Sequence, residues 1–287
     1  MKMRFLILGS NGMAGHMLYL YLKSKSYSVT GFAKSNPYQF DNIVIGNALD
    51  TVLIEKVIKN GSYDVVVNCI GILNDFAEKN KSIATFLNAY LPHFLAEITS
   101  DLQTRIIHIS TDCVFSGKKG AYTETDLKDG ATFYDRSKSL GELNDFKNLT
   151  LRNSIIGPDI NPKGIGLFNW FMQQNQKING FKKSIWTGQT TLQLAKTVEK
   201  AALLNATGLY NMVPDCSISK YDLLVLLNKT FRNNSLEIHS IEGIVSDKSL
   251  IRTKFDFDYG IPGYEQMIIE MYEWVLRNRQ LYPHYNF

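Results

Sequence analysis

Residues 4–15, RFLILGSNGMAG, decide the fold expected of this 287-residue chain. A short apolar run leads into three evenly spaced glycines, and the segment after them has apolar side chains at helical spacing. In such a strand, loop and helix, the first glycine permits a tight turn, the second lets the backbone approach a pyrophosphate, and the third lets the helix pack on the strand. We therefore predict a dinucleotide site, the alternative being a plain turn whose glycines serve geometry alone. Its predicted residues are Gly9, Asn11, Gly12, Met13 and Gly15.

Short apolar runs alternate with helical patterns through the first half of the chain. Runs rich in Val, Ile, Leu and Phe without polar alternation are typical of parallel strands that are buried on both faces. The order of elements therefore predicts an α/β fold with a doubly wound parallel sheet, the Rossmann arrangement. The predicted strands span residues 4–9, 27–33, 41–46, 64–72, 105–115 and 149–156, and the predicted helices span residues 15–25, 51–60 and 84–100.

The second half of the chain is more mixed. A helix is expected to begin at Ser219, where SKYD resembles a capping box, and another is expected over residues 265–279, with an apolar stripe typical of core packing. We expect residues 1–155 to form the dinucleotide-binding domain and residues near 187–212 to return to it. The remaining residues, 156–186 and 213–287, are expected to form a smaller, interleaved substrate lobe.

Composition and charge exclude several classes of protein. Hydrophobic residues make up 45% and charged residues 20% of the chain, as in an ordinary enzyme, and the net charge of +4 is spread without a basic block, so nucleic acid is not an expected partner. Cys69, Cys113 and Cys216 lack CxxC spacing, so neither a disulfide framework nor a metal site is expected. No apolar stretch approaches the roughly 18 residues needed to span a membrane, and we expect a cytoplasmic protein.

Tyr134 and Lys138, in FYDRSKSLGEL, have the spacing of a catalytic pair. Residues four apart share one face of a helix, so the phenol and the ammonium can point at the same ligand. A phenol with an ordinary pKa of about 10 is a poor acid or base at neutral pH, and a nearby ammonium is expected to lower that pKa. Thr111 ends an apolar run and should therefore lie at the carboxyl edge of the sheet, where ligands bind.

Together these segments resemble the extended short-chain dehydrogenases/reductases, in particular the dTDP-4-dehydrorhamnose reductase family. The GxxGxxG spacing, the segment STDCVFSGKKGAYTETD (110–126) and the pair in FYDRSKSLGEL carry the resemblance, which continues through LRNSIIGP and SLIRTKFD. It implies that Thr111 orients a substrate carbonyl, that Tyr134 protonates it, and that Lys138 holds the nicotinamide ribose. It also implies that Asn88 supports the site and lies among further cofactor residues, which are Asn47, Ala48, Cys69, Ile70 and Gly71.

The end of the second predicted strand bears on the choice of cofactor. An NAD enzyme tends to place an acidic residue there to bind the ribose 2′-hydroxyl, whereas this chain has Lys34 and Ser35. A lysine would attract a 2′-phosphate, so we expect NADPH rather than NADH. The alternative is that Lys34 only contacts solvent in a loop.

Two residues depart from the family pattern. Asp135 stands where the family generally has glycine, and its carboxylate would raise the pKa of Tyr134 if it pointed inward, although we expect it to face solvent. Cys113 matches a position that is an epimerisation residue in the related GDP-fucose synthases. No convincing histidine partner appears in residues 157–171, GPDINPKGIGLFNWF, so we interpret Cys113 as a packed strand residue.

The resemblance implies a nucleotide-sugar substrate, reduced at its 4-keto group for surface polysaccharide synthesis, and it leaves a homodimer open. Two alternatives remain, an epimerase or dehydratase of the same superfamily, for which Asp112 and Glu124 could serve, and a non-catalytic NADP-binding regulatory subunit. The expected substrate residues are Asp112, Trp186, Lys248, Arg252 and Lys254.

Overall fold

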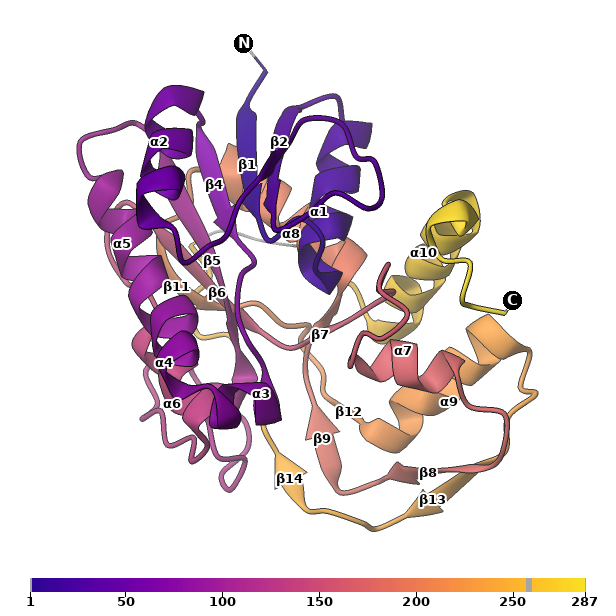
Figure 1. The fold of residues 1–287 in the computed structure, drawn as a ribbon. Coiled ribbons are helices and arrows are strands. Elements are labelled where there is room, and N and C mark those ends of the chain that lie inside the picture. The colour runs from indigo at the N-terminus through magenta and orange to yellow at the C-terminus, as the bar shows by residue number, and fades with distance from the viewer. Residues whose placement is uncertain (1, 257–259, 287) are drawn as a thin grey trace.

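A seven-stranded parallel sheet forms the centre of the computed structural model, which describes residues 2–256 and 260–286 (Figure 1). The strand order is β11-β6-β5-β4-β1-β2-β3, so the chain turns in opposite directions from β1 to β2 and from β1 to β4. This reversal opens a crevice at the carboxyl ends of β1 and β4, as in other doubly wound sheets, and the predicted fold class is confirmed. The strands are β1 (Arg4–Leu8), β2 (Ser28–Ala33), β3 (Ile43–Ile45), β4 (Val65–Asn68), β5 (Arg105–Thr111), β6 (Leu149–Asn153) and β11 (Gly208–Asn211).

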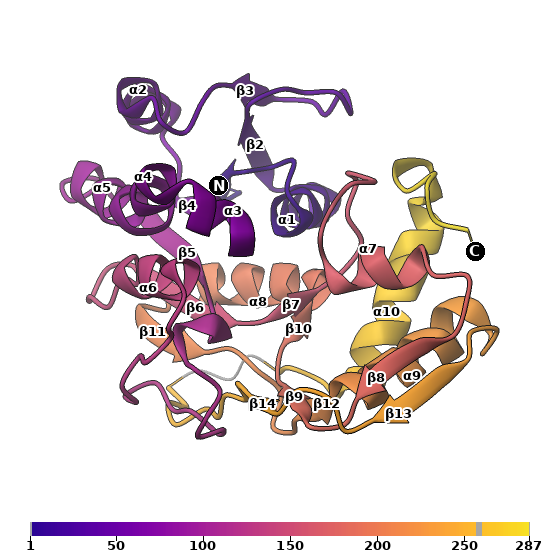
Figure 2. The ribbon, with the colours of Figure 1, turned by 60° about the horizontal axis from the view of Figure 1, so that its bottom comes forward.

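Helices cover both faces of the sheet (Figure 2). On one face Leu18 of α1 and Leu194 of α8 belong to the same buried cluster, and on the other face Ile54 of α2 and Leu95 of α5 share a second cluster. Apolar side chains therefore cover the strands from above and below, which explains why the strand sequences lack polar alternation. These helices are α1 (Met13–Ser24), α2 (Thr51–Gly61), α3 (Asn74–Lys79), α4 (Lys81–Ala84), α5 (Leu91–Ile98), α6 (Phe133–Leu140) and α8 (Thr191–Leu203).

The single helix predicted over residues 84–100 contains a wider, π-helical turn at Thr85–Tyr90 between α4 and α5. Asn88 lies in this turn and is fully buried. Its amide oxygen accepts from the Ile72 amide at 2.9 Å, and its nitrogen donates to Ser137 Oγ at 3.0 Å. These two hydrogen bonds join the segment after β4 to helix α6 through the wide turn. Such turns are frequent at functional sites.

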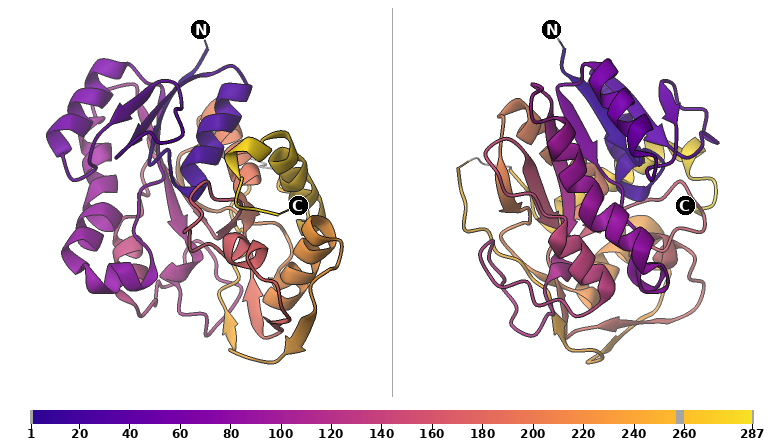
Figure 3. Two further views of the ribbon diagram at one scale, coloured as in Figure 1. Left: turned by 45° about the vertical axis from the view of Figure 1, so that its right-hand side comes forward. Right: turned by 60° about the vertical axis from the view of Figure 1, so that its left-hand side comes forward.

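A smaller lobe packs beside the sheet domain (Figure 3). Its core joins Phe168 of α7 and Leu223 of α9 to the stripe of α10, where Met267, Ile268 and Met271 are buried as the sequence predicted. The remaining elements are β7 (Ile155–Ile156), α7 (Leu167–Met172), β8 (Ile178–Phe181), β9 (Ser184–Trp186), β10 (Gln189–Thr190), β12 (Ile218–Ser219), α9 (Lys220–Arg232), β13 (Ile238–Ile241), β14 (Ser246–Asp247), α10 (Tyr264–Arg277) and 3-10 turns at Asp112–Val114 and Arg279–Leu281.

The strand predicted over residues 149–156 is broken at Ser154. β6 ends in the central sheet, whereas β7 pairs with β10, so the chain leaves the sheet domain at this break. It returns through α8, which packs against α1, and through β11, the edge strand beside β6. Residues 1, 257–259 and 287, which belong to the expected domain and lobe, lie outside the described residues.

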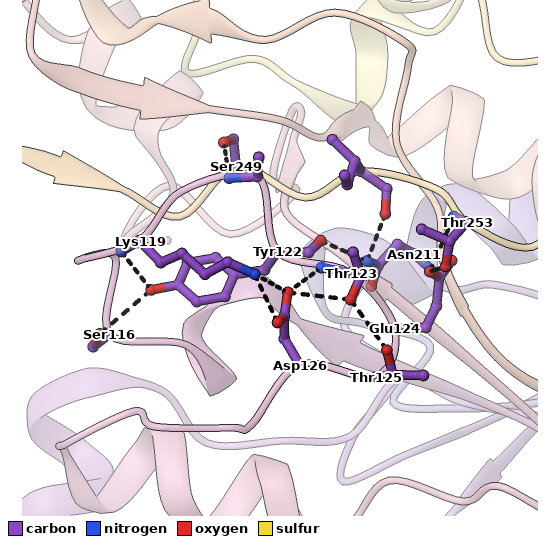
Figure 4. A network of polar contacts seen from close by, with 12 residues as sticks. Ser116, Lys119, Tyr122, Thr123, Glu124, Thr125, Asp126, Asn211, Ser249 and Thr253 are labelled. Atoms are coloured by element: carbon purple, nitrogen blue, oxygen red, sulfur yellow. Dashed lines mark hydrogen bonds and ion pairs between the residues drawn. The ribbon is translucent and has the colours of Figure 1, made fainter.

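A network of hydrogen bonds joins the loop after β5 to Asn211 and to residues 249–253, which follow β14 (Figure 4). Asn211 Nδ2 donates to the carbonyls of Tyr122 and Ile251, both at 2.9 Å. The carboxylate of Glu124 accepts from the amides of Asn211 at 3.2 Å and Thr253 at 3.1 Å. Glu124 is therefore a structural anchor, and this use of its carboxylate removes it from the residues considered for dehydration.

Candidate active site

The glycine loop has the close packing that its sequence predicted. Gly9 has a φ of +83°, a conformation that side-chain-bearing residues rarely adopt, and a Cβ on Gly15 would lie 2.1 Å from the Gly9 carbonyl oxygen. Helix α1 begins after Gly12, and no side chain caps its first amides. These amides and the helix dipole form a site suited to a phosphate group.

Polar atoms around this loop also lack partners among the described residues. Ser10 Oγ and Asn11 Oδ1 are buried without a hydrogen bond. The other end of the Asn11 amide donates to the Ser35 carbonyl at 2.7 Å and so joins the glycine loop to the segment after β2. Unpaired buried polar atoms are costly unless a ligand satisfies them, so the residues present fit a bound dinucleotide.

The remaining predicted cofactor residues follow neighbouring strands. Lys34 and Ser35 are exposed after β2, and no acidic side chain accompanies them there. Asn47 and Ala48 follow β3, where Asn47 Oδ1 accepts from the Leu49 amide at 3.1 Å. After β4 the backbone closely approaches the glycine loop, because a Cβ on Gly9 would lie 3.1 Å from the Ile70 side chain. Cys69 and Gly71 flank this contact.

Thr111, Tyr134 and Lys138 come together beside this crevice. Thr111 is the last residue of β5, and its hydroxyl lies within hydrogen-bond reach of the Tyr134 phenol. Lys138, one helical turn beyond Tyr134 on α6, donates to the Ile109 carbonyl at 2.8 Å and lies 3.3 Å from His108 Nε2. All three predicted residues are buried.

The expected effect of Lys138 on Tyr134 is not observed. Burial raises the pKa of Tyr134 well above its usual value, nearby Cys113 and Asp112 add to the rise, and Lys138 is not among the groups that act on the phenol. The ammonium instead points toward β5, and burial lowers the pKa of Lys138 to about 8. The i, i+4 spacing placed the two residues on one helix face but did not fix the direction of the long lysine side chain.

Asp135 is buried, so the expectation that it faces solvent was wrong. It is the third residue of α6 and forms a capping box with Thr132. Its carboxylate accepts from the Thr132 amide, its own amide donates to Thr132 Oγ, and both distances are 3.1 Å. A capping box satisfies two free helix amides reciprocally. Asp135 therefore fixes the start of the helix that carries Tyr134, and its charge also contributes to the raised pKa of that tyrosine.

Cys113 is not a strand residue, as the sequence had indicated. β5 ends at Thr111, and Cys113 lies in the following 3-10 turn, where its amide donates to Thr111 Oγ at 3.1 Å. Burial raises the pKa of Cys113 to about 12. The thiol is therefore protonated at neutral pH. Together with Asp112, Cys113 lines a cavity next to Thr111.

A cavity of about 540 Å³ opens next to Thr111, between the sheet domain and the lobe. Trp170, Phe181 and Trp186 provide aromatic walls, and Asp112 and Cys113 form the side toward β5. Trp186 thus lies where the sequence predicted a wall. The other lining residues are Ser154, Leu167, Asn179, Ser184, Ile185, Lys220, Leu224, Ile244, Ser246 and Lys248.

Two lysines provide the positive charge of the cavity. Lys248 was predicted, and it faces Asp112 and Cys113. Lys220 was missed. Its ammonium lies 5.5 Å from the centroid of the Trp186 ring, burial lowers its pKa, and Asp112 partly offsets that effect. A cation in the first turn of a helix opposes the helix dipole, so the position of Lys220 just after the Ser219 cap was the available signal.

Two predicted substrate residues do not line the cavity. Arg252 donates to Asp215 at 2.7 Å, and Lys254 donates to the Leu209 carbonyl at 3.0 Å and lies over the ring of Tyr210. Both follow the segment that bears Lys248, but that segment runs away from the cavity to join the edge of the sheet at β11. Arg252 and Lys254 were predicted because their segment resembles the family's substrate-proximal segment, and that resemblance did not fix which of its side chains face the cavity.

The described residues contain no group of three or more His, Cys, Asp or Glu side chains that could hold a metal ion. They also contain no helix with the length and apolar character needed to cross a membrane.

Comparison with known proteins identifies related chains. The RmlD substrate binding domain family matches residues 3–153, more than half of this chain. Over 139 residues the chain is 32% identical to the probable low-salt glycan biosynthesis reductase Agl14 of Haloferax volcanii, a match that covers 47% of this chain and 46% of that protein. Over 99 residues it is 38% identical to dTDP-4-dehydrorhamnose reductase of Mycobacterium tuberculosis, which covers 32% of each protein.

Another relative is not named as a reductase. The chain is 27% identical over 142 residues to methionine adenosyltransferase 2 subunit beta of Xenopus laevis, covering 48% of this chain and 41% of that protein. The chain thus spans less than half the length of the curated relatives that it matches. A solved dTDP-4-dehydrorhamnose reductase from Bacillus anthracis, in complex with NADP, has the same fold, with a TM-score of 0.79 at 20% identity, and covers 95% of this chain and 99% of that one.

Proposed function

We propose that this chain, which belongs to the RmlD substrate binding domain family of extended short-chain dehydrogenases/reductases, catalyses the NADPH-dependent reduction of the 4-keto group of a nucleotide-diphospho-deoxysugar. The observation that carries the proposal is the convergence of Thr111, Tyr134 and Lys138 between the glycine loop and a cavity with aromatic walls. The reaction would take place in the cytoplasm and supply surface polysaccharide synthesis.

The residues of the site have separate tasks in such a reduction. Bound NADPH would supply the hydride. Charge that develops on the carbonyl oxygen needs a hydrogen-bond donor and then a proton. The Tyr134 phenol stays protonated at neutral pH because burial raises its pKa, so it can donate a hydrogen bond to the carbonyl oxygen while Thr111 orients the carbonyl. The phenol is then a weak acid, and it would give up its proton only to the strongly basic alkoxide that forms when the hydride reaches the carbonyl carbon. Lys138 and the uncapped start of α1 would hold the cofactor.

The segment after β2 supports the choice of NADPH. The exposed Lys34 has no acidic neighbour there, so a 2′-phosphate would meet an attractive charge. Replacing Lys34 with Ala should weaken NADPH binding and leave NADH binding nearly unchanged. Equal losses for both cofactors would contradict the assignment of Lys34 to the 2′-phosphate.

The direct test is consumption of NADPH with a panel of dTDP- and UDP-linked 4-keto-6-deoxysugars. Tyr134→Phe should lower kcat by about 10²- to 10⁴-fold, the usual range for loss of a general acid, and should still bind NADPH. Tyr90→Phe makes the same change at an exposed tyrosine and should keep full turnover. No turnover of any sugar by the unmodified chain, with NADPH bound, would rule out the reductase.

Two further functions remain as competing proposals. The first is an epimerase or a dehydratase. The position of Asp112 and Cys113 in the cavity lining beside Thr111 supports it. Either would convert a nucleotide sugar without net consumption of NADPH, so product analysis separates them from a reductase. Similarity to methionine adenosyltransferase 2 subunit beta supports a regulatory subunit, and such a role would survive Tyr134→Phe.

A further inference from the structure

Residues 157–166, which connect β7 to α7, form a loop that rises beside α1 (Figure 2). At one end of this connection, a Cβ on Gly166 would lie 3.0 Å from Met13 Sδ, so the backbone touches the first residue of α1. Near its start, Ile160 belongs to the buried cluster against which Tyr38, in the segment after β2, is packed. The connection therefore lies near both segments that the cofactor is proposed to bridge, the phosphate end at the start of α1 and the adenosine end after β2.

This connection is held in one shape by its own polar contacts. Asn169 of α7 is fully buried, and its Nδ2 donates to the carbonyls of Gly164 at 2.7 Å and Pro162 at 3.2 Å. Asp159 Oδ1 accepts from the Asn161 amide at 2.9 Å. Such a loop keeps its internal form but still needs an anchor to fix its position against the crevice.

The C-terminal segment, residues 279–286, supplies that anchor. The Tyr285 phenol accepts a hydrogen bond from the Asp159 amide at 2.9 Å, and its ring packs edge-on against Phe168 with centroids 5.4 Å apart. Tyr282 contacts α1, where its hydroxyl lies 3.0 Å from His16 Nε2. The two tyrosine rings also stack on each other, 5.9 Å apart.

His16 connects Tyr282 to the glycine loop through hydrogen bonds of its two ring nitrogens. It is fully buried on α1, and burial lowers its pKa to about 4, so the ring is neutral at physiological pH. A neutral ring has one donor and one acceptor. Since the Gly12 carbonyl 3.0 Å away can only accept, Nδ1 donates to it, and Nε2 is left to accept from the Tyr282 hydroxyl. The C-terminal segment is thus hydrogen-bonded through His16 to the residue that starts the phosphate site.

We propose that the C-terminal segment 279–286 positions the dinucleotide site, with Tyr285 holding the 157–166 connection and Tyr282 holding the glycine loop through His16. This inference rests on the proposed function, since it assumes that the crevice binds NADPH. Tyr282 and Tyr285 are positioning residues, because neither is placed against the reacting atoms. Their hydroxyls should therefore affect cofactor affinity and leave the chemical step nearly unchanged.

The test uses the full chain and the single-atom changes Tyr285→Phe and Tyr282→Phe. Loss of one such hydrogen bond corresponds to about a three- to tenfold change in an equilibrium constant. Each variant should raise the Kd and KM for NADPH by about that factor, while kcat and the KM for the sugar change less than about twofold. Tyr272→Phe is the matched control, since this partly exposed tyrosine of α10 packs against Phe231, away from the crevice.

Three outcomes would overturn the positioning role. Unchanged NADPH affinity in both variants, with tight binding by the unmodified chain, would overturn the positioning role and leave the proposed function intact. An equal loss in the Tyr272→Phe control would overturn it as well, because the effect would then be general destabilisation. A chain that binds no NADPH at all would overturn both proposals. Faster amide exchange over residues 157–166 in Tyr285→Phe alone would support the anchor.

Discussion

Replacing Lys138 with Met should remove activity and make the stability difference from the unmodified protein depend on pH. Lys138 is buried, and burial lowers its pKa from 10.5 to about 8. Its charged form is therefore unfavourable in the folded protein at neutral pH. Methionine has a similar length and no charge, so the variant avoids this cost while it loses the hydrogen bond to the Ile109 carbonyl.

The magnitude follows from the displacement of the pKa. Lowering the pKa of Lys138 by about 2.5 reduces the free energy of unfolding of the unmodified protein at pH 7 by about 3 kcal/mol. The unpaired Ile109 carbonyl in the variant costs about 1–3 kcal/mol in return. At pH 7 the free energy of unfolding of Lys138→Met should therefore exceed that of the unmodified protein by about 0–2 kcal/mol. Lys138 would then lower the stability of the folded protein while it serves the reaction.

The pH dependence provides the sharper test. Between pH 8 and 10.5 the unfolded chain binds more protons at Lys138 than the folded chain, so the unmodified protein gains stability as pH rises. The advantage of the variant should shrink by about 2.5 kcal/mol between pH 7 and pH 10. Neighbouring groups do not interfere in this range, because burial lowers the pKa of His108 well below 6.5 and raises that of Cys69 to about 12.

Urea unfolding at pH 7, 8, 9 and 10, followed by circular dichroism, measures the difference directly. Lys79→Met, at an exposed lysine, controls for the loss of a surface charge. A stability difference between Lys138→Met and the unmodified protein that stays constant with pH, or grows in favour of the variant, would refute the reasoning.

Three other substitutions have expected outcomes. Thr132→Ala removes the cap of α6 and should cost about 0.5–2 kcal/mol in thermal or urea unfolding; no loss of stability would contradict the capping role. Gly15→Ala should abolish NADPH binding in a fluorescence titration, because the added methyl would collide with the Gly9 carbonyl, and retention of affinity would argue against this packing. Arg152→Ala leaves Glu142 buried without its bidentate partner and should cost about 3–5 kcal/mol in urea unfolding, whereas a cost below about 1 kcal/mol would show that the pair is dispensable.

Local signals predicted the parts of the site that depend on short spacing. The glycine loop requires residues without side chains at set intervals, and Thr111 ends a recognisable apolar run, so both could be found from the sequence. The same reasoning failed for the directions of side chains. It assigned Asp135 to solvent and Cys113 to a strand, because neither the cap of α6 nor the turn after β5 is visible in a hydrophobic pattern.

The sequence by itself determined the doubly wound sheet, the phosphate loop at the start of α1 and the three residues that meet beside it. The sheet and the loop follow from local backbone demands and from a periodicity that holds along each element, whereas the three residues were identified through the resemblance of their segments to the family. Only the tertiary structure decided which charges face the cavity, because Lys220 enters from the start of α9 while Arg252 and Lys254 turn toward the edge of the sheet. It likewise brought Tyr282 and Tyr285, near the end of the chain, against His16 of α1 and Asp159 of the 157–166 connection. Contacts between residues so distant in sequence arise from packing of the lobe on the sheet, and no local pattern records them.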